Sequence, residues 1–331
     1  MPEAACRVGL AGMNRREFMR GAAALTTMAA LPGTGWTADG TTAAERKFKV
    51  ALTPGSIGVT VTSQRELNGL AQRHRFEAVE PLSVEIAAMT AVQIEALTGD
   101  LATRGLVWAA ASLPVDFCKD DAQFREGMKK LPGLAAGLQR AGVRRVGTWV
   151  MPSHDMLTYR ENFKVHTARL GEVARVLRDH DLRLGLEYIG TQLLLVSKRY
   201  PFVHTLAEMR ELIAEIGTGN VGLVLDTWHW WTAGDTVADL RTLKNEDVVS
   251  VDLNDAPKGV AKPQQKDNER ELPVATGVID TAGFLGALVA IGYTGPVRAE
   301  PFNKAVNALE NEPACAAVSA AMWQAMESIK G

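Results

Sequence analysis

Short apolar runs alternate with stretches of helical periodicity along most of this chain. The runs are dominated by Val, Leu, Ala and aromatic residues, as in parallel strands that are buried on both faces. They cover residues 48–55, 76–82, 105–113, 144–152, 182–190, 221–229, 248–255 and 295–302. Apolar positions at helical spacing predict helices near 64–74, 91–103, 121–142, 160–180, 204–217, 235–245, 280–292 and 304–328.

This alternation of strand-like runs and helical stretches predicts an α/β fold, the (β/α)8 TIM barrel, of ordinary length for such a barrel. We expect residues 47–331 to form a single TIM-barrel catalytic domain. A doubly wound open sheet is the alternative. It is disfavoured because no glycine-rich phosphate loop follows the first strand-like run.

Four of the strand-like runs in the second half end on a carboxylate: Glu187, Asp226, Asp252 and Glu300. The carboxyl ends of the strands of a closed parallel barrel meet at one mouth, where the active sites of such barrels lie. With period-two alternation, these acids face the barrel interior, and Leu184, Leu186, Leu223 and Leu225 face the helices. Carboxylates gathered at one point repel one another unless a cation holds them, so the pattern predicts a metal site and hence an enzyme.

Composition and charge narrow the class of protein. The chain has 331 residues, of which 47% are hydrophobic and 22% charged, and a formal net charge of −2. This balance gives no general attraction to nucleic acid or anionic membranes, so we expect a small-molecule substrate and no nucleic-acid partner. Three scattered cysteines exclude a disulfide framework and a thiolate zinc site. No transmembrane span is expected after the N-terminal segment, and a homo-oligomer is the default for such an enzyme.

The first 38 residues have the character of an export signal. Arg15 and Arg16 precede Glu17, Phe18 and Met19, and an Ala-rich apolar stretch and small residues follow. This order resembles a twin-arginine signal peptide, so residues 1–38 are expected to be an N-terminal extension and signal, with Met13 a candidate initiator. We then expect a periplasmic or otherwise exported protein that uses the twin-arginine (Tat) machinery. A short tail with two chance arginines is the alternative.

The segments LEYIG, LDTWHWW, DLNDAP, RELP…GVID and IGYTGPVRAEPF resemble the sugar phosphate isomerase/epimerase family of xylose isomerase-like TIM barrels. The resemblance implies one divalent metal ion held at the positions of Glu187, Asp226, Asp252 and Glu300. It also implies a substrate contact at His229. Asp252 departs from the pattern, because a histidine is expected there.

An aspartate at position 252 changes the expected metal chemistry. An all-oxygen ligand set favours hard ions such as Mg²⁺ or Mn²⁺ over Zn²⁺, and we also expect Co²⁺ to be accepted. Arg298 lies one interior layer below Glu300, on the strand next to Asp252. The alternative is therefore that Asp252 pairs with Arg298, which leaves three protein ligands or no metal.

Further polar and aromatic residues are candidates for substrate binding, and each has an ordinary structural alternative. Glu80 ends the second strand, and His154 follows the fourth. Trp228 could offer an aromatic face to a sugar ring or pack between barrel and helix. Lys258 and Arg270 belong to a long segment after the seventh strand, which we expect to be either a lid over the site or a charged surface loop.

The resemblance implies that Glu187 and Glu300 transfer protons next to a substrate carbonyl. The predicted function is a metal-dependent isomerase or epimerase of carbohydrate metabolism that acts on a ketose or keto-sugar derivative. A keto-sugar or keto-inositol dehydratase or lyase would share the first step. A non-catalytic periplasmic sugar-binding protein is the alternative from another class, and the aspartate at position 252 is its main support.

Overall fold

Nine strands form one parallel sheet in the computed structural model, which describes residues 46–329. The residues of the predicted twin-arginine signal lie outside this range. The sheet has the order β3-β2-β1-β11-β10-β9-β7-β5-β4. Its strands are β1 (Lys49–Leu52), β2 (Ala78–Val79), β3 (Val107–Trp108), β4 (Ala111–Ser112), β5 (Arg145–Val150), β7 (Arg183–Tyr188), β9 (Val221–Asp226), β10 (Val248–Leu253) and β11 (Pro296–Ala299).

The sheet closes into a barrel through one interrupted strand. β3 pairs with β2 and β4 pairs with β5, all in parallel, and only Ala109 and Ala110 separate β3 from β4. The predicted strand 105–113 is thus one barrel strand with a break in its middle. The fold predicted from the sequence, a TIM barrel, is confirmed, and the open-sheet alternative is excluded.

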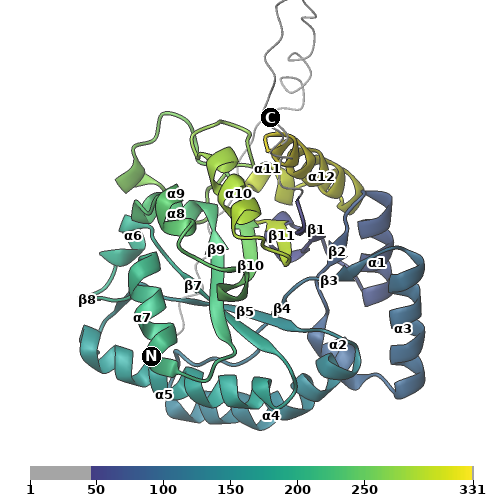
Figure 1. The fold of residues 1–331 in the computed structure, drawn as a ribbon, viewed down its shortest axis with the longest axis horizontal. Helices are drawn as coiled ribbons and strands as arrows, with labels where there is room; N and C mark the ends of the chain where they lie inside the picture. Colours follow the sequence, from purple (N-terminus) through teal and green to yellow (C-terminus); the bar gives the residue numbers. More distant parts are fainter. Residues whose placement is uncertain (1–45, 330–331) are drawn as a thin grey trace, which may run out of the picture. The chain divides into compact units, whose positions relative to one another are not determined.

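Helices form an outer ring around the strands (Figure 1). Most begin at a side chain that caps the helix N-terminus, such as Thr90 before α3 or Asp120 before α4. The main helices are α1 (Gln64–Arg73), α3 (Ala91–Thr103), α4 (Asp121–Arg140), α5 (Tyr159–Arg178), α7 (Leu206–Ile216), α10 (Thr281–Ala290) and α12 (Asn311–Glu327). The helix predicted over 235–245 is wrong in length, because only the short helix α9 (Val237–Leu240) forms there.

The barrel wall separates an apolar outer layer from a tighter interior. Leu184, Leu186 and Leu223 are buried in the main hydrophobic core, as the alternation pattern predicts. Inside the barrel, a Cβ at Gly185 would lie 2.8 Å from a methyl carbon of Val224. A side chain at position 185 would therefore have to displace the neighbouring strand, which explains glycine there.

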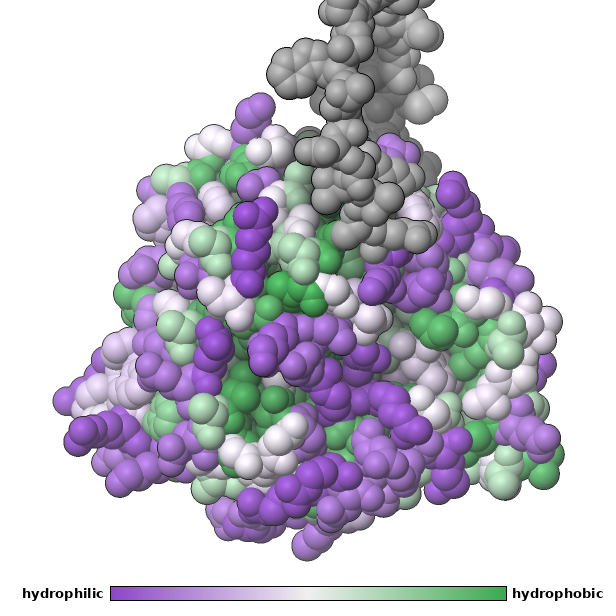
Figure 2. Space-filling view, in the orientation of Figure 1, coloured by the Kyte–Doolittle hydropathy of each residue, from purple (hydrophilic) through white to green (hydrophobic). Residues whose placement is uncertain are grey.

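Several short helices and strands lie in the connections between the barrel strands, in addition to the main helices. They are α2 (Ser83–Ala88), α6 (Gln192–Leu195), α8 (Thr227–Ala233), α11 (Lys304–Asn307) and the antiparallel pair β6 (Ser153–His154) and β8 (Tyr200–Pro201). No helix within residues 46–329 is both long and apolar enough to cross a bilayer. On the face seen in Figure 2, hydrophilic residues predominate and hydrophobic residues form separate patches.

Candidate active site

The four carboxylates predicted from the strand ends lie together. One oxygen each from Glu187, Asp226, Asp252 and Glu300 lies within 4.8 Å of the others. All four residues are buried, with at most 8% of their surface exposed. The convergence follows from parallel register: Asp252 lies beside Asp226 on β9 and beside Arg298 on β11, and Glu300 follows β11 directly.

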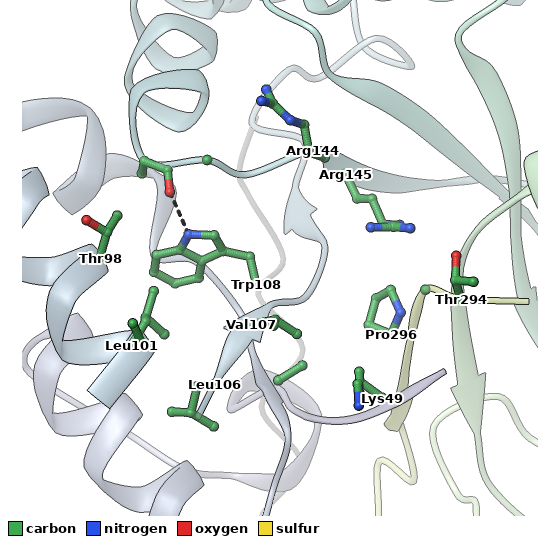
Figure 3. A pocket seen from close by; sticks show the side chains of 15 residues that line it. Lys49, Thr98, Leu101, Leu106, Val107, Trp108, Arg144, Arg145, Thr294 and Pro296 are labelled. Atoms are coloured by element: carbon green, nitrogen blue, oxygen red, sulfur yellow. Dashed lines mark hydrogen bonds between the residues drawn. The ribbon is translucent and has the colours of Figure 1, made fainter. Parts of the chain in front are cut away.

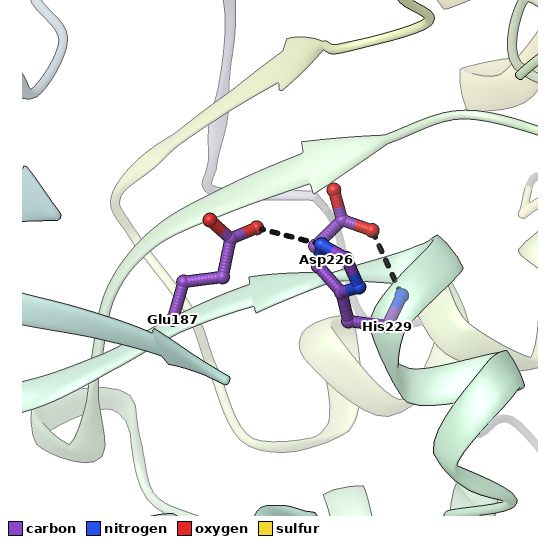
Figure 4. Close-up of side chains that lie close together, drawn as sticks. All are labelled: Glu187, Asp226 and His229. Carbon is purple, nitrogen blue, oxygen red and sulfur yellow. Dashed lines mark hydrogen bonds and ion pairs between the residues drawn. The ribbon is translucent and has the colours of Figure 1, made fainter. Parts of the chain in front are cut away.

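Asp226 is fixed by its position between a strand and a helix. It is the last residue of β9 and the N-cap of α8, and its Oδ1 accepts hydrogen bonds from the backbone N–H groups of Trp228 (2.6 Å) and His229 (3.0 Å). Figure 4 shows that His229 lies next to both carboxylates, with its ring toward Glu187 and its backbone N–H toward Asp226. Burial alone would raise the pKa of Asp226, but the charge of Arg270 and the hydrogen bonds lower it, so this carboxylate is ionised.

Arg270 enters the cluster from the segment that follows β10. Its Nη1 donates to Asp226 Oδ2 at 2.9 Å and to Glu300 Oε2 at 3.2 Å. Its Nη2 donates to His229 Nε2 at 3.1 Å and to Asp267 Oδ1 at 2.9 Å. Arg270 is therefore a buried internal cation. The sequence predicted Arg270 in either a lid or a charged surface loop, and it gave no indication of Asp267, which does not end a strand.

Arg298 is the second arginine of the cluster, and it contacts Asp252 and Glu300. Its Nε and Nη2 donate to the two oxygens of Asp252 at 2.6 and 2.8 Å, and Nη2 also donates to Glu300 Oε1 at 2.8 Å. The alternative weighed from the sequence, a pair between Asp252 and Arg298, is thus present. A bidentate guanidinium–carboxylate pair fixes the orientation of both groups.

Glu187 contrasts with its neighbours because its Oε1 is buried without a hydrogen-bond partner among the described residues. Burial, followed by the negative charges of Glu300 and Asp226, raises the pKa of Glu187 well above its usual range. Burial likewise raises the pKa of Glu300 to about 8. Nε2 of His229 is 3.8 Å from Glu187, but burial lowers the pKa of His229 to about 4, so the imidazole is neutral and cannot compensate.

These residues fit a divalent cation. Fully ionised, the four carboxylates and two guanidinium groups leave a surplus of two negative charges. Glu187, which has one unpartnered buried oxygen, offers an oxygen to the same cluster as Asp226 and Glu300, and all-oxygen sets suit hard ions. Asp252 also offers an oxygen, since a carboxylate oxygen can accept a hydrogen bond and still have a lone pair. Each of its two oxygens already accepts one hydrogen bond from Arg298.

A cavity of about 230 Å³ opens onto two of the four acids. Glu187, Glu300 and Arg298 line its floor, and Glu80 lines its wall, where Ser112 Oγ donates to Glu80 Oε1 at 3.1 Å. Burial raises the pKa of Glu80. Three further lining residues were not predicted from the sequence: Thr53 follows β1, Ser112 ends β4, and Trp149 lies near the end of β5.

Other residues predicted to bind substrate lie away from this cavity. Trp228 is fully buried and packs against Arg270, so the predicted aromatic contact with a sugar is wrong in this structure. His154 lies on β6 and lines a separate cavity with Cys118 and Lys198. Lys258 is exposed in the 254–280 segment. His229 and Arg270 do belong to the carboxylate cluster, but they lie behind it and do not line the cavity.

A larger cavity, of about 390 Å³, lies at the amino ends of the strands. Trp108 and Leu101 line it together with Lys49, Arg144 and Arg145 (Figure 3). No carboxylate and no histidine lines this cavity. The chemistry that the carboxylates allow belongs to the smaller cavity at the opposite end.

Curated relatives include isomerases and dehydratases. The chain is 23% identical over 201 residues to an inosose isomerase of Halalkalibacterium halodurans, covering 59% of this chain and 66% of the relative. It is 30% identical over 101 residues to a 3-dehydroshikimate dehydratase of Pseudomonas aeruginosa, covering 30% of this chain and 16% of the relative. The chain thus spans slightly less than two thirds of the inosose isomerase and a small part of the dehydratase.

Solved structures share the fold over most of the chain. A xylose isomerase domain protein of Alicyclobacillus acidocaldarius is 31% identical, with a TM-score of 0.74 over 86% of this chain and 100% of that one. The IOLI protein with a zinc atom is 18% identical, with a TM-score of 0.70 over 85% of this chain and 99% of that one, and it shows the fold alone. The model of the xylose isomerase-like TIM barrel family matches residues 69–325. This chain therefore belongs to the xylose isomerase-like TIM barrel family.

Proposed function

We propose that this protein is a divalent-metal-dependent isomerase or epimerase of a keto-sugar, which transfers a proton at the carbon next to a carbonyl. One observation carries the proposal: two buried glutamates with raised pKa values, Glu187 and Glu300, lie on the floor of one cavity. Carboxylates with raised pKa are stronger bases toward carbon acids than ordinary ones. The inosose isomerase relative acts on the same class of substrate by its name.

Each carboxylate of the cluster has its own proposed role. Glu187 has an unpartnered oxygen and is the proposed base, and Glu300 is the proposed second proton carrier. Asp226 is ionised and held by Arg270 and the α8 backbone, so it anchors charge without moving a proton. Glu187, Asp226, Asp252 and Glu300 are the groups that would hold the ion. A bound divalent ion supplies positive charge that polarises the carbonyl.

A dehydratase of a keto-sugar is the second candidate, and Glu80 favours it. Elimination needs an acid that protonates the departing hydroxyl, in addition to the base that removes the proton. Glu80 lines the same cavity, and burial raises its pKa. The matched segment of the 3-dehydroshikimate dehydratase agrees with this chemistry.

The test is solvent deuterium uptake by keto-inositols, ketoses and 3-keto-glycosides with Mn²⁺, Mg²⁺, Co²⁺ or Zn²⁺. Exchange at one carbon with the skeleton intact supports the isomerase, and loss of water supports the dehydratase. Glu187→Gln and Glu300→Gln are each expected to reduce exchange by at least about a hundredfold. The exposed Glu126→Gln on α4 is the matched control and keeps full activity.

Two results would contradict the proposal. If both glutamine variants exchange deuterium at the wild-type rate, neither Glu187 nor Glu300 transfers the proton. Binding of a sugar with no metal after native purification, and with no exchange under any metal, would instead favour the non-catalytic sugar-binding protein.

A further inference from the structure

Arg298 is an arginine inside the barrel, on β11, two residues before Glu300. The sequence pattern alone suggests only that it neutralises Asp252. A bidentate pair with one carboxylate uses only two of the five N–H donors of a guanidinium. The hydrogen bonds of Arg298 show that part of the group is left over.

A guanidinium has five N–H donors in a planar fork. Nε of Arg298 donates to Asp252, and Nη2 donates to both Asp252 and Glu300. Nη1 makes no hydrogen bond to any residue between 46 and 329. The side chain nevertheless lines the 230 Å³ cavity, and 24% of its surface is exposed. The two N–H groups of Nη1 are therefore available to a molecule in the cavity.

We propose that Nη1 of Arg298 donates a hydrogen bond to the carbonyl oxygen of the substrate, which makes Arg298 a catalytic residue. This inference rests on the proposed function and deepens it. Nη1 and Nη2 are held a short fixed distance apart by the planar group, and Nη2 is bonded to Glu300. In this proposal an oxygen bound to Nη1 shares the planar guanidinium with the Glu300 carboxylate, which places that carboxylate near the carbon next to the carbonyl.

The charge and proton balance of the step follows from this placement. A glutamate carboxylate takes the proton from the carbon, and the C–H electron pair becomes the new C=C bond. The C=O π pair moves onto oxygen, where Arg298 stabilises the negative charge and keeps its own proton. Asp252 and Glu300 hold Nε and Nη2 of the guanidinium, so the Nη1 donor is oriented before the substrate arrives.

Four variants separate this role from simple neutralisation of Asp252. They are Arg298→Lys, Arg298→Met, Asp252→Asn and the double variant Asp252→Asn/Arg298→Met, compared at saturating Mn²⁺ with its binding measured in each. Arg183→Met, at the other end of the barrel, is the matched control for loss of a partly buried arginine. The readouts are kcat and KM for deuterium exchange on a keto-inositol, and the calorimetric affinities for the keto-inositol and the parent inositol.

We expect Arg298→Met to lower kcat by about a hundredfold or more, with a smaller change in KM, and Arg298→Lys to restore part of the loss. The double variant should remain as impaired as Arg298→Met. Arg298→Met should also lose preference for the ketone over the alcohol. If Arg298 only neutralises Asp252, the double variant regains activity and the preference is unchanged, and the inference is refuted.

This experiment can fail separately from the proposed function. A protein that prefers the ketone through Arg298 but exchanges no proton would retain this inference and lose the proposed function. If the double variant exchanges deuterium at the wild-type rate, the proposed function stands and Arg298 has no part in the catalysis.

Discussion

At the scale of single residues, the site depends on arginines as much as on carboxylates. Arg270 is 2% exposed and bridges Asp226 and Glu300 from behind, whereas Arg298 reaches the cavity. Removing one partner of a buried ion pair leaves the other charge unpaired, which costs more than the pair contributes. The two arginines therefore differ in role: one supports the cluster and the other is available to a ligand.

Replacing Arg270 by Met is expected to lower the free energy of unfolding by about 3–5 kcal/mol. The loss should be larger above the pKa of Glu300, about 8, than in mild acid, where the glutamate can take up a proton instead. Urea unfolding at two pH values measures this. Lys258→Met, at an exposed position, is the control, and an equally small effect at Arg270 would contradict the buried-cation assignment.

Sequence reasoning was effective for residues whose position in a strand fixes their direction. The four carboxylates end strands, so parallel register alone brings them together. It was weaker for Arg270 and Asp267, because their approach depends on the path of an irregular segment. Trp228 was misplaced because a residue in the first turn of a helix can face either the mouth or the barrel wall, and packing against Arg270 decides which.

At the scale of elements, α8 couples the site to the backbone of its neighbours. Gly190, just after β7, lies so close to α8 that a Cβ there would overlap the carbonyl oxygen of His229 and lie 2.8 Å from Ala233 N. The loop after Glu187 and the helix capped by Asp226 therefore fix each other. The hydrophobic pattern predicted the strands that precede this loop and this helix. It does not predict such contacts between backbone segments.

Gly190→Ala is expected to displace α8 and weaken Mn²⁺ binding by about tenfold or more, because Asp226 caps that helix. Calorimetric titration with Mn²⁺ measures the effect, and circular dichroism checks that the barrel is folded. Gly99→Ala is the matched control: nothing lies within 4 Å of a Cβ there, and alanine favours α3. Unchanged Mn²⁺ affinity in Gly190→Ala would show that α8 does not position Asp226.

At the scale of the whole molecule, the barrel buries acids that would be fully charged in the unfolded chain. The raised pKa values of Glu187 and Glu300 mean that the folded, metal-free protein binds more protons than the unfolded chain in the window between about 4.3 and about 8. Stability conferred by these protons is present at low pH and is lost as pH rises through the window. A divalent ion would replace the protons.

The melting temperature of the protein in chelator is therefore expected to fall between about pH 5 and about pH 8, because the free energy of unfolding decreases by up to about 1.4 kcal/mol per pH unit for each group. Saturating Mn²⁺ should raise the melting temperature and flatten its pH dependence. Glu300→Gln should reduce the slope in chelator. A melting temperature that rises with pH in chelator would contradict the raised pKa values.

Fold and family are confirmed over the length of the barrel, because eight regular strand and helix repeats leave few alternative topologies. The break between β3 and β4 was not predictable, since the run 105–113 is continuously apolar. The export prediction from Arg15 and Arg16 stays a prediction, because these residues lie outside the described range.

The carboxylate of Asp226 belongs to the cluster, and its Oδ1 caps α8 through two amide protons, those of Trp228 and His229. Any ligand that draws electron density from this carboxylate weakens those two bonds. The NMR chemical shifts and exchange rates of these two amide protons would then report whether the site is occupied, without an assay substrate.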